Sequence, residues 1–149
     1  MDELLPQEAD TLSSITGIQD EMRQLLVQLY DDMIRVMPGE DELYYSRFYF
    51  SDQATMRRVM TLVLGHLLTN REKIEKKDKT YFFSEHLFRV LRVPSQDCFR
   101  KLFSSKVTKN NENVVWLYCH NILEISDRYA KVLGLDTREK IEKFVKGGS

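Results

Sequence analysis

Residues 110–134 read NNENVVWLYCHNILEISDRYAKVLG and carry the clearest helical pattern in the chain. Apolar residues recur there mostly at intervals of three or four, at Val115, Cys119, Ile122, Ile125, Tyr129, Val132 and Leu133. This spacing places side chains on one face of an α-helix. Because Trp116, Leu117 and Leu123 widen that face, we expect most of the helix surface to be buried. The stretch predicts the central helix of an all-α domain.

Both ends of this stretch carry the signals that bound a helix. Asn110, Asn111 and Asn113 are residue types that cap the amino end of a helix with their side chains. Lys131 suits the negative end of the helix dipole, and Gly134 is placed for a left-handed C-cap. The predicted helix therefore begins near Asn110 and ends at Gly134.

Apolar spacing, caps and helix breakers predict further helices on both sides of this one. Two strong ones cover residues 18–37, ended by Pro38-Gly39, and residues 51–70, capped by Ser51 or Asp52. Shorter helices are expected over residues 84–91, after Ser95 with Cys98, Phe99, Leu102 and Phe103, and from Asp136, in a capping box with Glu139, to Lys146.

The remaining segments leave alternatives open. Residues 40–50 fit a short helix from Asp41, but their aromatic residues also suit a strand. Residues 1–16 have the apolar spacing of a short helix and enough acidic residues for a mobile arm, and Gly17 is expected to interrupt them.

The chain of 149 residues has the size of one domain. We predict an all-α, single-domain irregular bundle of about six helices over residues 18–146. Residues 1–17 would be an acidic N-terminal arm or short helix, and residues 147–149 a flexible tail or a cloning scar. No apolar run approaches the roughly 18 residues of a membrane span. Asp2 and Glu3 are opposite in charge to the start of a signal peptide.

Charge is unevenly distributed along the chain. Residues 1–52 contain twelve Asp and Glu against three Arg, and residues 53–149 contain nineteen Lys and Arg against eleven Asp and Glu. Either the acidic part packs against the basic part, within one chain or between copies, or the basic part faces nucleic acid or another acidic surface. The interleaving of acidic and basic residues favours the first explanation.

Two sets of residues are candidates for contact with a partner. The aromatic set combines large side chains with acidic neighbours, which favours core packing or a protein contact over base stacking, and comprises Tyr44, Tyr45, Phe48 and Tyr49. The basic set is the candidate nucleic-acid contact and comprises Arg57, Arg58, Arg71, Lys73, Lys76, Lys77 and Lys79.

Signals for chemistry are weak. The three histidines, His66, His86 and His120, are scattered, and Cys98 and Cys119 have no metal-binding spacing, so we expect free thiols and no metal or other cofactor. We expect His66 to be a hydrogen-bonded core or boundary residue. No phosphate loop, GxSxG or HExxH motif occurs. The sequence therefore favours a protein that is not an enzyme.

Three motifs together point to a family. They are a helix that ends at Met37-Pro38 before an acidic, aromatic segment, the run IEKKDKTYFF at residues 74–83, and NVVWLY at residues 113–118. In this order and spacing they resemble small helical proteins encoded by large nucleocytoplasmic DNA viruses of eukaryotes. The family pattern usually has a basic residue and a leucine where this chain has Leu117 and Cys119. The resemblance covers residues 25–125 and carries over no catalytic residue.

The resemblance implies a protein that acts in the cytoplasmic virus factory of the host cell or in the virion. The leading hypothesis is a non-enzymatic structural or factory component that binds a protein partner, either viral or a second copy in a homo-oligomer. The alternative is a nucleic-acid-binding accessory protein in genome packaging or transcription. A viral decoy that binds a host helix in a groove is a third hypothesis, which no sequence feature selects.

Overall fold

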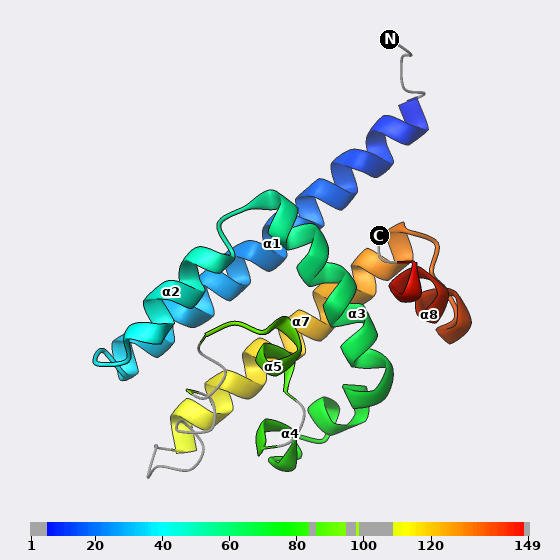
Figure 1. Cartoon of the computed structure of the whole chain (residues 1–149). Coiled ribbons are helices and arrows are strands. Elements are labelled where there is room, and N and C mark those ends of the chain that lie inside the picture. The colour runs from blue at the N-terminus through cyan, green and yellow to red at the C-terminus, as the bar shows by residue number, and fades with distance from the viewer. Residues whose placement is uncertain (1–5, 84–85, 95–97, 99–108, 148–149) are drawn as a thin grey trace.

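The computed structural model describes residues 6–83, 86–94, 98 and 109–147, and that part of the chain contains seven helices and no strand. The helices are α1 (Pro6–Val36), α2 (Asp41–Tyr49), α3 (Gln53–Glu75), α4 (Thr80–Phe83), α5 (Leu87–Leu91), α7 (Lys109–Val132) and α8 (Arg138–Lys146). Figure 1 shows them gathered in one irregular bundle. The predicted all-α, single-domain bundle is confirmed.

Helices α1 and α7 form a long antiparallel pair (Figure 1). The Arg128 guanidinium contacts Glu21 at 2.8 Å, and the Tyr118 hydroxyl donates a hydrogen bond to Asp32. Residue numbers rise along α1 as they fall along α7, which gives the antiparallel register. The pair supplies much of the core, because each helix turns an apolar face to the other.

The stretch at residues 110–134 forms α7, as predicted, with ends that differ by one or two residues. Gly134 adopts a φ of 73°, the left-handed conformation expected of a C-cap glycine. Trp116 is 1% exposed and lies with its ring centroid 4.7 Å from that of Phe82. Leu117 differs from the prediction, because it faces solvent with 60% of its surface exposed. The buried face of α7 is therefore narrower than the sequence indicated.

The predicted break at Gly17 is wrong, because α1 runs without interruption from Pro6 to Val36. A glycine inside a helix costs only about 1 kcal/mol relative to alanine, so a long helix tolerates it. The carboxyl end is as predicted, since Pro38 follows it closely. Figure 1 shows the amino-terminal turns of α1 extending past the rest of the bundle.

Helix α3 is central, packing against α1, α5, α7 and α8. Its N-cap is Asp52, whose carboxylate accepts a hydrogen bond from the Ala54 amide at 3.1 Å. The helix continues five residues beyond the predicted end at Asn70. Ile74 explains the extension, because its side chain is buried and its carbonyl accepts a hydrogen bond from His120 Nε2 at 3.0 Å.

Gly65 lets α8 approach α3 closely. An added Cβ at Gly65 would lie 3.0 Å from Val145 Cγ1 of α8. Thr137 caps α8 and accepts a hydrogen bond from the Lys140 amide at 3.2 Å. The predicted cap one residue earlier, at Asp136, is therefore wrong.

The shorter segments settle some alternatives. Residues 41–49 are helical, so the strand alternative is excluded. Helix α5 begins at Leu87 and is capped by His86, whose Nδ1 accepts a hydrogen bond from the Arg89 amide at 3.2 Å. The predicted helix after Ser95 lies outside the described residues except for Cys98, which is buried. None of the described helices has the length and apolar character that crossing a membrane requires.

Candidate interaction surfaces

The outer face of α2 presents a stripe of aromatic side chains to solvent. Tyr44, Tyr45 and Phe48 are 43%, 68% and 70% exposed. With Asp41 they occupy positions i, i+3, i+4 and i+7, so they share one face of the helix. We call the three aromatic residues the α2 stripe. Large apolar side chains grouped in this way are typical of surfaces that bind other proteins.

The opposite face of α2 explains why the stripe points outward. Leu43 and Ser46 are fully buried, as is Phe50 directly after the helix. The Phe50 ring packs 5.5 Å from the ring of Tyr30 on α1. A helix has only one side against α1, so burial of this face directs the α2 stripe away from the core.

Tyr49 is separate from the other predicted contact residues. Its hydroxyl accepts a hydrogen bond from Arg58 Nη1 at 2.9 Å and donates one to the Leu91 carbonyl at 3.4 Å. Its side chain is partly buried and links α2, α3 and α5. Of the predicted aromatic set, the structure thus brings three members together on the surface and gives Tyr49 an internal role.

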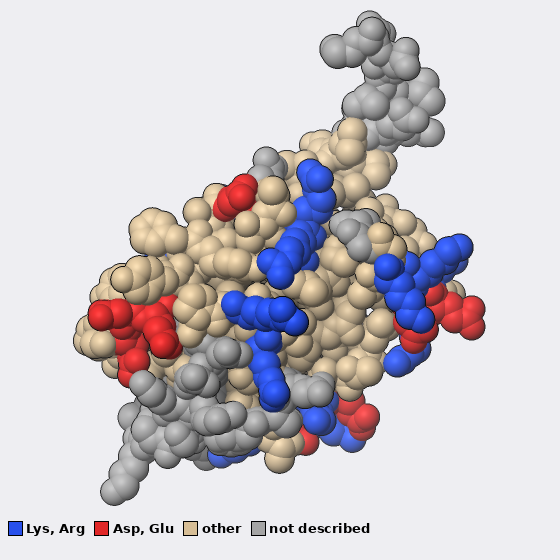
Figure 2. Space-filling view, viewed as in Figure 1, with Lys and Arg blue, Asp and Glu red and all other residues tan. Residues whose placement is uncertain are grey.

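Acidic side chains border the α2 stripe. Asp41 and Glu42 are exposed in the first turn of α2. Figure 2 shows acidic side chains gathered at the left of the molecule, over the end of the bundle that holds α2. The nearest basic side chain on the helix, Arg47, is paired with Asp31 at 2.6 Å. The surface around the stripe is therefore negatively charged.

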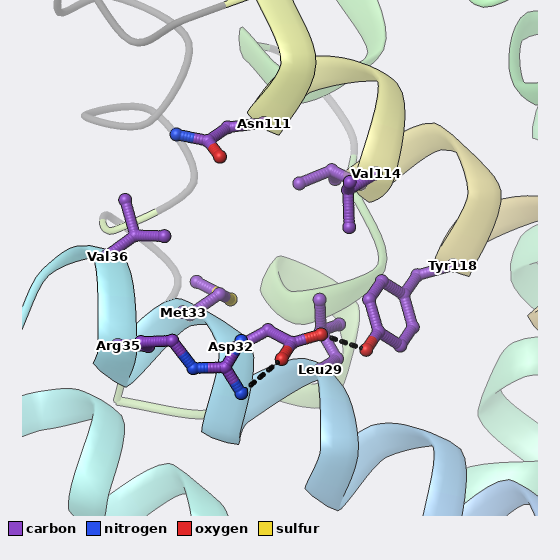
Figure 3. Close-up of a pocket in the computed structure, with 9 residues that line it drawn as sticks. Leu29, Asp32, Met33, Arg35, Val36, Asn111, Val114 and Tyr118 are labelled. Carbon is purple, nitrogen blue, oxygen red and sulfur yellow. Dashed lines mark hydrogen bonds and ion pairs between the residues drawn. The ribbon is translucent and has the colours of Figure 1, made fainter.

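A groove lies between the carboxyl end of α1 and the amino end of α7 (Figure 3). Leu29 and Met33 contribute apolar walls, and the half-exposed Val36 and Val114 line its edges. Its volume is about 180 Å³. Small-molecule sites are usually larger, at about 300–1,000 Å³. An apolar cavity of about 150 Å³ holds a benzene ring, so this groove fits one large apolar side chain.

One wall of the groove carries a chain of polar contacts (Figure 3). Tyr118 donates a hydrogen bond to Asp32, which also pairs with Arg35 at 3.0 Å. Burial, the hydrogen bond and the charge of Asp32 raise the pKa of the Tyr118 phenol above its usual value. The phenol is therefore a neutral hydrogen-bond donor at physiological pH.

Sequence reasoning missed the groove. Its edges are single valines that belong to two helices some eighty residues apart in the chain, so no local pattern marks them. Trp116 and Tyr118 contact different helices, since Trp116 meets α4 and Tyr118 meets α1.

The predicted basic set is divided between the two ends of α3. At the carboxyl end, Arg71 pairs with Asp127 at 2.5 Å, Lys76 with Glu72 at 2.5 Å, and Lys79 with Glu112 at 3.2 Å. Lys73 and Lys77 lie at this same end. Arg57 and Arg58 are exposed near the amino end, about 20 Å from Arg71 and about 28 Å from Lys76 along the helix axis. The seven residues therefore do not form one continuous patch.

The acidic and basic parts of the chain are joined by few direct ion pairs. Within the described ranges, Arg128 with Glu21 at 2.8 Å is the one pair that joins residues 1–52 to residues 53–149. Among the described residues, ion pairing between the two parts thus accounts for little of the charge asymmetry.

The histidine and cysteine side chains that could take part in chemistry are instead engaged in contacts within the fold. His66 Nε2 lies 2.7 Å from the Tyr81 hydroxyl, so the prediction of a hydrogen-bonded histidine is confirmed. Burial raises the pKa of the Cys119 thiol to about 12, which keeps it protonated and unreactive. His120, next to it in sequence, is engaged with the Ile74 carbonyl. The described part of the chain holds no group of three or more side chains that could bind a metal ion.

Comparison with known proteins adds no relative. No family model, no curated protein and no solved structure matches the chain.

Proposed function

We propose that this protein is a non-enzymatic interaction module that binds another protein through the α2 stripe. The single observation that carries the proposal is the joint exposure of Tyr45 and Phe48, at 68% and 70%. Exposed aromatic side chains in water forgo the stabilisation that burial gives, about 25 cal/mol per Å² of apolar surface. Contact with a partner would recover it.

The residue types also favour a protein partner. Tyr and Phe are enriched in protein interfaces, and a few buried aromatic residues usually provide most of the binding free energy. The acidic border at Asp41 and Glu42 favours a partner whose apolar patch is surrounded by Lys and Arg, because opposite charges speed association and select the partner.

The groove between α1 and α7 is a secondary part of the proposal. Its volume of about 180 Å³ suits one side chain of a partner better than a metabolite. The cellular setting that we propose, a virus factory or a virion, rests on the family resemblance of residues 25–125 alone.

Affinity purification from cells that make the protein, with nuclease treatment, tests the proposal. The double variant Tyr45→Ala/Phe48→Ala should lose the main co-purifying protein, since truncating each hot-spot residue costs about 2 kcal/mol or more, or roughly 30-fold in affinity. The matched control is Leu12→Ala/Leu117→Ala, which removes exposed apolar side chains from α1 and α7.

The variants differ only at exposed positions, so their thermal unfolding should match that of the unmodified protein. Recovery of the same proteins with the α2 double variant as with the control would refute the proposal. Recovery of a second copy of the chain would instead identify the interaction as self-association.

A further inference from the structure

We infer that Arg57, Arg58, Arg89 and Arg92 form a site for the phosphate backbone of a nucleic acid. These four residues are called the arginine cluster below. Arg57 and Arg58 belong to the sequence-based basic set, whereas Arg89 and Arg92 come from α5 and the residue after it. The site lies at the amino end of α3, away from the other basic residues of that set.

The tertiary structure brings the two pairs of arginines together. The Tyr49 hydroxyl lies 2.9 Å from Arg58 Nη1 and 3.4 Å from the Leu91 carbonyl. One hydroxyl thus joins the Arg58 guanidinium to the carboxyl end of α5, where Arg92 follows Leu91 directly. Figure 2 shows Lys and Arg side chains in a row over α3 and α5 on this face, with few acidic side chains beside them.

Among the described residues, three of the four arginines in the cluster have no neutralising carboxylate. Arg57, Arg58 and Arg92 form no ion pair with any residue in the described ranges. Six other described arginines each lie within 4.0 Å of a carboxylate, namely Arg23, Arg35, Arg47, Arg71, Arg128 and Arg138. Positive charge is therefore left available at Arg57, Arg58 and Arg92, whereas these six arginines are neutralised.

The chemistry of the cluster favours phosphate. A guanidinium presents paired N–H donors that match the oxygens of a phosphate group, and it stays charged at every physiological pH. All four side chains are exposed, which suits successive phosphates of a polymer better than one phosphate held in a pocket.

A protein partner fits this surface less well. Specific protein interfaces have an apolar core inside a polar rim. The large apolar side chains that the structure exposes lie on α1, α2 and α7, and none of those described lies on α3 or α5. Recognition at the arginine cluster would thus depend on charge, which is the main source of sequence-independent binding to nucleic acids.

The far end of α3 provides a matched control. Lys76 and Lys77 are also exposed, but the Glu72 carboxylate contacts Lys76 at 2.5 Å. If basic residues acted through total charge alone, removing either pair would have the same effect. If the arginine cluster is the site, only removal of the arginines should weaken binding to nucleic acid.

The experiment measures fluorescence anisotropy of a labelled DNA duplex or RNA single strand of about 20 nucleotides, at about 50 and 200 mM salt. If the bound cluster neutralises three phosphates, the affinity should fall roughly 40-fold between these salt concentrations. Arg57→Gln/Arg92→Gln, which removes no hydrogen bond or ion pair described above, should weaken binding at the lower salt about tenfold and should flatten the salt dependence by nearly two units of slope. Lys76→Gln/Lys77→Gln should bind as the unmodified protein does.

Three results would overturn the inference. The first is absence of binding to both probes at the lower salt concentration. The second is equal weakening by the lysine and arginine double variants. The third is equally effective displacement of the probe by poly-glutamate at matched charge, which would assign the cluster to acidic proteins.

Discussion

Acidification should destabilise the folded protein through one buried side chain, His66. Its imidazole is 6% exposed, and its Nε2 atom lies 2.7 Å from the Tyr81 hydroxyl. The Leu87 amide donates a further hydrogen bond to the same hydroxyl at 3.0 Å, which fixes the position of Tyr81. Burial, and to a smaller extent the charge of His86, lower the pKa of His66 from 6.5 to about 4.

The sign of the effect follows from proton binding in the two states. Between pH 6.5 and about 4 the unfolded chain binds a proton at His66 that the folded protein does not bind. The neutral imidazole therefore contributes its full stability above pH 6.5 and loses it as the pH falls toward 4. A lowering of the pKa by about 2.5 units corresponds to a loss of about 3 kcal/mol in the free energy of unfolding.

Urea unfolding followed by circular dichroism at several pH values between 7 and 4 measures this loss. The control is His66→Gln, which keeps a polar side chain but does not titrate. Its own destabilisation is present at every pH, and carboxylates that titrate near pH 4 affect both proteins equally. The free energy of unfolding of the unmodified protein, relative to that of the variant, should therefore fall by about 3 kcal/mol between pH 7 and pH 4. The same pH dependence of the free energy of unfolding in both proteins would refute this role of His66.

Three further substitutions test the packing. Gly17→Ala should raise the free energy of unfolding by about 1 kcal/mol, because Gly17 is helical with open space around it; a loss in urea unfolding would contradict this. Ser126→Ala should stabilise by about 1 kcal/mol, since the buried Ser126 hydroxyl has no hydrogen-bond partner among the described residues, and an unchanged unfolding midpoint would count against it. Gly65→Leu should displace α8 and speed hydrogen exchange of its amides, because a Cβ there already lies 3.0 Å from Val145; unchanged exchange in α8 would show that the helix adapts.

The sequence predicted the parts of the fold that local pattern controls. Regular apolar spacing located α7 and α3, and Pro38 located the end of α1. Gly17 shows the limit of this reasoning, because a single unfavourable residue does not decide the course of a helix of 31 residues. The end of α3 was missed for a related reason. Burial of Ile74 depends on α7, which follows much later in the chain.

The candidate surfaces were harder to predict, because they depend on which side of each helix is covered. Tyr44 to Phe50 contains enough aromatic residues for both faces of α2, and only the position of α1 decides which ones are buried. The basic residues illustrate the opposite difficulty. Arg58 and Arg92 are 34 positions apart in sequence and are brought together by Tyr49, whereas Arg58 and Lys76 lie near opposite ends of one helix.

The most direct test of the proposed function is site-specific photo-crosslinking from the α2 stripe inside cells. A photoreactive phenylalanine analogue placed at Phe48 should give one dominant protein adduct, and the same analogue at Leu117 should not. Adding Tyr45→Ala should strongly reduce the adduct at position 48, because the two side chains would share one contact. Absence of an adduct at position 48, or the same adducts from both positions, would contradict the account.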